Sequence, residues 1–145
     1  MLVFLVRHGH SDPGDPDDLR PLSTRGRGEA SAVAERLAAH ATPPRLVLSS
    51  PLVRARETAQ AIAGAVAAEL RVDERLAPGA TAEELQQALQ GAKGPVAAVG
   101  HQPDCSEIAL ALTGRDPGFS PGGFAELELG DGVGVRPKSD PNSVT

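Results

Sequence analysis

Aromatic residues and cysteines are nearly absent from this 145-residue chain. It holds three Phe, no Tyr and no Trp, and its single cysteine is Cys105. Proteins that hold single-stranded nucleic acid by base stacking need aromatic platforms, so that function is disfavoured. A single cysteine excludes an internal disulfide framework and fits a reducing compartment. We therefore expect a cytoplasmic protein whose core is built from aliphatic side chains.

Long apolar runs and an excess of positive charge are also missing. The apolar run at 2–6 is far too short for a signal sequence, and no run approaches the length of a membrane-spanning helix. The net charge of -5 repels nucleic acids and anionic membranes, which are bound mainly through Lys and Arg. We expect neither a nucleic acid nor a membrane as a partner.

Short apolar runs alternate with amphipathic stretches along most of the chain. The runs have the continuous hydrophobicity of strands that are buried on both faces, and the stretches between them place apolar residues at helical spacing. This alternation predicts an α/β three-layer sandwich, in which a mainly parallel sheet is flanked by helices on both faces. The strands are expected at 2–6, 46–48, 70–72 and 96–99, and the helices near 30–38, 52–66, 81–89 and 104–112.

The C-terminal part has a different pattern. Apolar and polar residues alternate at 124–129, as in a half-exposed strand. A second short strand at 133–135 can pair with it across a Gly-Asp-Gly turn, which predicts a C-terminal antiparallel hairpin. We expect one domain over 1–136, followed by a polar and disordered tail at 137–145.

Three helix starts carry capping signals. Ser50 followed by Pro51 is typical of an N-cap and a first helical position. Capping-box spacing is found in two pairs of residues, Thr81 with Glu84 and Asp104 with Glu107.

Basic residues follow the ends of three predicted strands. Arg7 and His8 follow the first strand, Arg54 lies in the first turn of the helix after the second, and His101 comes just after the strand at 96–99. Ligands of open α/β sheets bind beyond the carboxyl ends of the strands. In an acidic chain, two arginines and two histidines at this edge predict an anion site.

The expected anion is a phosphoryl group. The donor forks of Arg7 and Arg54 match phosphate oxygens in pairs, and a helix that begins at Ser50 would add its positive dipole end. A neutral imidazole is a nucleophile. One histidine can therefore take the phosphoryl group, while the other stabilises charge on the transferring oxygens together with the arginines.

Four neighbouring residues are expected to contact the substrate. Gly9 has no side chain, so the backbone can approach a ligand closely there. Ser11 and Ser50 carry hydroxyls that can contact phosphate or close a turn, and Gln102 lies at the rim of the site. The four His and one Cys show no metal-ligand spacing, and arginines would repel a cation, so we expect no metal and no organic cofactor.

Three motifs of this chain resemble those of the histidine phosphatase superfamily, whose members include the phosphoglycerate mutases. They are Arg7-His8-Gly9, Ser50-Pro51-x-x-Arg54-x-x-x-Thr58 and Gly100-His101, in the family's order and spacing over residues 2–113. The resemblance implies a phosphohistidine intermediate at His8, with Arg7, Arg54 and His101 as the phosphate pocket.

Two further stretches look more specifically like the SixA-type phosphohistidine phosphatases. They are Arg20-Pro21-Leu22-Ser23-x-x-Gly26 and Val99-Gly100-His101-x-Pro103. The short chain, which leaves no room for the cap insertions of the mutases, points the same way.

One part of the family pattern does not match. Many members carry an acidic residue after the third strand that protonates the leaving alcohol, usually in a Glu-Gly context. The region 73–84 offers Glu74, Glu83 and Glu84 as candidates without that context. The P–N bond of phosphohistidine is labile and needs less help from an acid, so the mismatch favours phosphohistidine over an alkyl phosphate.

Three functions stay open at this point. The first is a SixA-like phosphatase that acts on a phosphohistidine-bearing protein. The second uses the same machinery on small phosphomonoesters such as sugar phosphates or nucleotides. The third is a non-catalytic phosphate-recognition module, which is disfavoured because binding alone would be served by Arg and Lys without two histidines.

Overall fold

A computed structural model describes residues 1–130 of the chain. The strands are β1 (Leu2–Arg7), β2 (Leu46–Ser49), β3 (Glu69–Val72), β4 (Val96–Gly100) and β5 (Phe124–Glu128). The helices are α1 (Thr24–Ala38), α2 (Val53–Val66), α3 (Ala82–Leu89) and α4 (Asp104–Thr113), with short 3-10 turns η1 (Asp17–Leu19) and η2 (Glu74–Leu76).

The five strands form one mixed sheet in the order β3-β2-β4-β1-β5. The first four strands are parallel, and β5 runs antiparallel to β1. Arg7 lies beside Gly100 and Ser49 beside Val99, so the carboxyl ends of β1, β2 and β4 are level with one another. The segments that follow these three strands therefore begin at the same edge of the sheet, as the sequence predicts.

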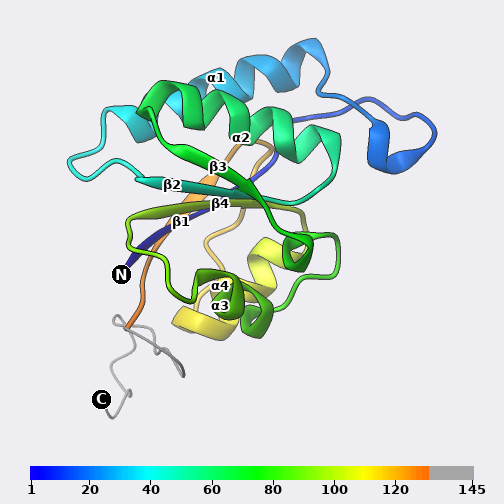
Figure 1. The fold of residues 1–145 in the computed structure, drawn as a ribbon. Coiled ribbons are helices and arrows are strands. Elements are labelled where there is room, and N and C mark those ends of the chain that lie inside the picture. The colour runs from blue at the N-terminus through cyan, green and yellow to red at the C-terminus, as the bar shows by residue number, and fades with distance from the viewer. Residues whose placement is uncertain (131–145) are drawn as a thin grey trace.

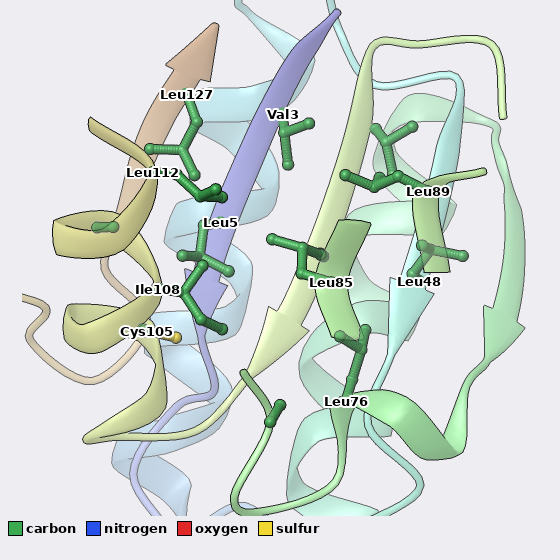
Figure 2. Close-up of a cluster of buried hydrophobic side chains, with 14 of the residues drawn as sticks. Val3, Leu5, Leu48, Leu76, Leu85, Leu89, Cys105, Ile108, Leu112 and Leu127 are labelled. Atoms are coloured by element: carbon green, nitrogen blue, oxygen red, sulfur yellow. The ribbon is translucent and has the colours of Figure 1, made fainter. Parts of the chain in front are cut away.

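Helices cover both faces of the sheet, which confirms the predicted three-layer α/β architecture. Helices α1 and α2 lie on one face, and α3 and α4 on the other (Figure 1). Side chains of β1 alternate between the two cores: Phe4 and Val6 pack toward α1 and α2, whereas Val3 and Leu5 pack on the other side. Figure 2 shows the second core, where Leu5 lies against Ile108 of α4.

Two of the three predicted capping signals are wrong. Helix α2 begins at Val53 with Leu52 as N-cap, and the Ser50 hydroxyl accepts a hydrogen bond from Leu52 N–H outside the helix. Helix α4 has Pro103 as its N-cap, and the Asp104 carboxylate instead accepts from the backbone of another segment. The capping box of Thr81 with Glu84 is confirmed at the start of α3.

The C-terminal predictions are only partly covered by the described residues. The strand expected at 124–129 is present as β5, and its antiparallel partner is β1. The second strand of the predicted hairpin, at 133–135, and the tail at 137–145 lie outside the described residues, so these elements and the domain boundary stay predictions. Within residues 1–130, no helix is long and apolar enough to cross a membrane.

The loop after β1 is fastened to the start of α1 by a close backbone approach. A Cβ atom on Gly9 would lie 2.6 Å from the carbonyl oxygen of Gly26, and a Cβ on Gly26 would overlap the carbonyl oxygen of His10. Ser23, the N-cap of α1, accepts from Gly26 N–H, and both its own N–H and its hydroxyl donate to that same His10 carbonyl. These contacts fix the backbone that carries His8.

We expect Gly26→Ala to destabilise the protein and Gly28→Ala not to. Both glycines lie in α1, but a Cβ on Gly28 meets nothing within 4 Å. The clash at Gly26 should lower the free energy of unfolding by at least about 2 kcal/mol. Gly28→Ala should raise it by about 0.5–1 kcal/mol, because alanine is the better helix former. Urea unfolding of the two variants measures both effects, and equal stabilities would contradict the close approach.

Candidate active site

A cavity of about 350 Å³ lies at the carboxyl edge of the sheet, and four residues singled out in the sequence line it. Arg7 and His8 come from the end of β1, Arg54 from the first turn of α2, and His101 from the end of β4. The remaining lining residues are Gly9, His10, Ser11, Asp17, Arg20, Pro78, Gln102 and Pro121.

The His8 ring is held in one tautomer. Its Nδ1 lies 2.6 Å from the carbonyl oxygen of Gly9, and a carbonyl can only accept, so Nδ1 carries the proton. The other ring nitrogen, Nε2, is then an unprotonated acceptor, and Arg54 Nε donates to it at 3.3 Å. The lone pair of a potential nucleophile therefore lies beside a guanidinium group that can bind an oxyanion.

His8 and His101 are neutral at physiological pH. Burial lowers the pKa of His8 to about 4, with Arg54 and Arg7 adding to the effect and the hydrogen bond to Gly9 opposing part of it. Burial, followed by the proximity of His8, lowers the pKa of His101 to about 3. The two rings meet edge to face with centroids 4.9 Å apart. An uncharged imidazole at neutral pH is the form that can attack phosphorus.

Arg54 and the loop around Gly9 are joined through Thr58. This buried hydroxyl accepts a hydrogen bond from Gly9 N–H at 3.1 Å and donates to the carbonyl oxygen of Arg54 at 2.9 Å. Helix α2 thereby sets the position of both the arginine and the backbone that orients His8.

Two buried nitrogen atoms of cavity-lining residues lack a partner among the described residues. They are Arg7 Nε and His101 Nδ1. Arg7 Nη1 donates to the carbonyl oxygen of Phe119 at 2.8 Å, and His101 Nε2 lies 2.7 Å from the Ser50 hydroxyl. Buried polar atoms are rarely left unpaired, so these nitrogens are suited to the oxygens of a bound anion.

Of the four predicted substrate contacts, three line the cavity. Gly9 and Ser11 do so, although the small size of Gly9 is required by Gly26 as well. Gln102 also lines it, while its amide group is hydrogen-bonded to the backbone and side chain of Ser106. Ser50 is fully buried beside His101 and does not line the cavity, so its hydroxyl is placed to orient that ring.

The candidate general acids lie elsewhere. Glu74 belongs to η2, and Glu83 and Glu84 belong to α3; none of them lines the cavity within the described part of the chain. The only carboxylate that does so among residues 1–130 is that of Asp17. A part in proton transfer for Glu74 or Glu83 stays a prediction.

Several residues of this cavity are not among the predicted catalytic or substrate-contacting residues. Asp17 and Arg20 come from the loop after β1, His10 follows Gly9, and Pro78 and Pro121 come from two other loops. The Arg20-Pro21-Leu22-Ser23 stretch was the one available signal, since it belongs to a SixA-like motif. No group of three His, Cys, Asp or Glu side chains in the described residues could hold a metal ion.

The fold and the cavity together define an α/β protein whose anion site is suited to phosphoryl transfer. Residues 3–78 match the model of the histidine phosphatase superfamily, branch 1. An uncharacterized protein from Picosynechococcus is 35% identical over 145 residues, which cover 90% of this chain and 86% of that protein. The chain belongs to the histidine phosphatase superfamily, and it is a phosphatase.

Two solved structures show how far the likeness extends. A protein assigned as the phosphohistidine phosphatase SixA from Agrobacterium tumefaciens is 28% identical, with a TM-score of 0.77 over 88% of this chain and 90% of that one. The protein histidine phosphatase SixA in complex with tungstate has a TM-score of 0.82 at 24% identity, over 95% of this chain and 94% of that one. The second likeness bears on the fold alone.

We expect the His8 ring to stay neutral far below the usual pKa of histidine. Its folded pKa of about 4 means that the lone pair on Nε2 is present from neutral pH down to about pH 4 and is lost below it. The ring signals in an NMR titration, assigned by comparison with His8→Asn, should therefore shift with a midpoint near pH 4. A midpoint near 6.5, the usual pKa of histidine, would show that burial does not set the charge of this ring.

Proposed function

We propose that this phosphatase hydrolyses phosphohistidine in proteins through a phosphohistidine intermediate on His8. The observation that carries the proposal is the tautomer of His8, in which the Gly9 carbonyl holds the proton on Nδ1 and leaves Nε2 free to attack. The partner is therefore a phosphorylated protein. The assignment is supported by the likeness to the A. tumefaciens protein assigned as SixA.

The first step forms a bond between His8 Nε2 and phosphorus while the P–N bond of the substrate breaks. Arg54 Nε, which donates to Nε2 in the free enzyme, turns to a phosphoryl oxygen as the lone pair of Nε2 is used. Arg7 and His101 supply the unpartnered nitrogens that bind the other oxygens. The electron pair of the broken P–N bond stays on the imidazole nitrogen of the substrate, and the ring departs neutral because its other nitrogen carries a proton from solvent.

The second step returns the enzyme to its starting state. Water attacks phosphorus on the side away from His8, the P–Nε2 bond breaks, and inorganic phosphate leaves. The electron pair of that bond returns to Nε2. Throughout, Nδ1 keeps its proton and donates it in a hydrogen bond to the Gly9 carbonyl. His8 therefore needs no change of tautomer during the cycle.

The carboxylates around the cavity favour a P–N substrate over an alkyl phosphate. An alkoxide leaving group needs a proton from a well-placed acid, whereas an imidazole is a much better leaving group. The one carboxylate that lines the cavity among the described residues, Asp17, is paired with Arg54, which holds the pKa of Asp17 below its usual value. An ionised carboxylate has no proton to donate.

We expect acid-labile phosphate on His8 during turnover of a phosphohistidine-bearing domain or of phosphoramidate. The label, followed by mass spectrometry, should be absent in His8→Ala, and turnover should fall at least about a thousandfold because the nucleophile is lost. His40→Asn is the matched control, since His40 lies at the far end of α1 and pairs with Glu126. That variant should retain both label and turnover.

Turnover of p-nitrophenyl phosphate and of sugar phosphates under the same conditions tests the substrate class. Faster hydrolysis of small esters than of the phosphohistidine-bearing domain would refute the protein substrate and leave the His8 mechanism intact. A phosphoenzyme that persists in His8→Ala would refute the mechanism itself.

A further inference from the structure

The guanidinium group of Arg54 is already occupied in the free enzyme. Its Nε donates to His8, its Nη1 donates to the backbone carbonyl of Asp17 at 2.7 Å, and its Nη2 lies 3.2 Å from Asp17 Oδ2. Arg54 is itself buried, with 6% of its surface exposed. A carboxylate thus already binds the guanidinium N–H donors that a phosphoryl group would need.

Asp17 is placed there by the loop that follows β1. Its other carboxylate oxygen, Oδ1, accepts from Arg20 Nε at 3.0 Å, and Arg20 Nη1 donates to the carbonyl oxygen of Asp12 at 2.8 Å. The Asp17 carboxylate therefore bridges two arginines that both line the cavity. The hydrogen bond from Arg54, with the charges of both arginines, lowers the pKa of Asp17, so the carboxylate is ionised at neutral pH.

A phosphoryl group and the Asp17 carboxylate cannot both have these donors. Each needs the N–H groups of Arg54, and two anions that share one fork repel each other. The side chain of Asp17 is 64% exposed, so it can leave Arg54 and remain hydrated. The buried arginine stays in place and exchanges one oxyanion for another.

We propose that Asp17 is an internal competitor for phosphate: it occupies Arg54 in the free enzyme, is displaced by the phosphoryl group of the substrate, and returns as inorganic phosphate leaves. The proposal rests on the proposed function, because it takes this cavity as the phosphoryl site. Its consequence is weak binding of free phosphate, which has no contacts outside the cavity with which to offset the displacement of Asp17. Product therefore leaves readily, and ambient phosphate does not fill the site.

Asp17 could instead be read as the missing proton donor, but its contacts argue against that role. A general acid must hold a proton when the substrate arrives, and a carboxylate between two guanidinium groups is deprotonated. The two roles also differ in what they predict. Loss of a proton donor slows the reaction of esters, whereas loss of a competitor tightens phosphate binding.

The test compares Asp17→Asn with Asp18→Asn. Asparagine keeps the size of the side chain and the backbone carbonyl that binds Arg54 Nη1, and removes only the charge. Asp18 lies next to it in η1, is exposed, and makes no side-chain hydrogen bond or ion pair within residues 1–130, so its replacement removes the same net charge from the same turn. Binding of inorganic phosphate to each full-length protein is measured by calorimetry, and its competitive inhibition constant is measured during turnover.

We expect Asp17→Asn to bind inorganic phosphate about two- to tenfold more tightly than wild type, with stronger product inhibition by the same factor. Asp18→Asn should bind phosphate like wild type, because an exposed charge without a contact is screened by salt. Thermal unfolding should match wild type for Asp18→Asn and fall only slightly for Asp17→Asn, because the asparagine amide oxygen can still accept from Arg54.

Three other outcomes overturn the proposal. Equal tightening in both variants would indicate a general charge effect with no special part for Asp17. Unchanged phosphate affinity in Asp17→Asn, with slower turnover of p-nitrophenyl phosphate, would show that Asp17 is the general acid for ester hydrolysis. In both cases the phosphoenzyme on His8 would still form, so the proposed function would stand. If wild type shows neither phosphate binding nor a phosphoenzyme, both the proposed function and the role of Asp17 as a competitor are refuted.

Discussion

The 2.6 Å hydrogen bond from His8 Nδ1 to the carbonyl oxygen of Gly9 decides which ring nitrogen can react, and the rest of the site depends on it. A carbonyl orients a ring only if the carbonyl itself cannot turn. Gly9 is held by its N–H on Thr58 of α2 and by the close approach of Gly26 in α1. The reactive nitrogen is thus positioned by two helices through a single backbone unit, and neither helix contributes a reacting atom there.

Burial supplies the second condition, a ring without charge. The same packing that fixes the histidines removes water from them, and this desolvation is the largest influence on the pKa of both His8 and His101. The arginines act in the same direction for His8. In the proposed mechanism, the arginines that attract a phosphoryl dianion therefore also keep the nucleophile unprotonated, and the two requirements do not conflict.

The sequence predicted the scaffold well because the relevant signals are local. Continuous apolar runs identify strands such as β1, and the residues that follow parallel strands must meet at one edge. Sequence-based prediction was wrong where a side chain makes its hydrogen bond to a residue far away in the sequence and not to a neighbour. Asp104 has capping-box spacing but binds the backbone at Gly79, and Ser50 holds His101 instead of starting α2. The sequence of the loop that carries Asp17 has no hydrophobic periodicity from which its path could be predicted. The contact between Asp17 and Arg54 could therefore not be predicted.

That contact also resolves a difficulty of any anion site in the absence of its anion. A guanidinium group as buried as that of Arg54 is costly to leave without partners, since its N–H donors lose water on folding. The carbonyl and carboxylate of Asp17 satisfy two of those donors in the empty enzyme. They can do so reversibly because Asp17 approaches from an exposed turn, whereas a buried partner would lock the arginine permanently. The contribution of this contact to stability and the proposed weak binding of free phosphate therefore follow from the same pair of side chains.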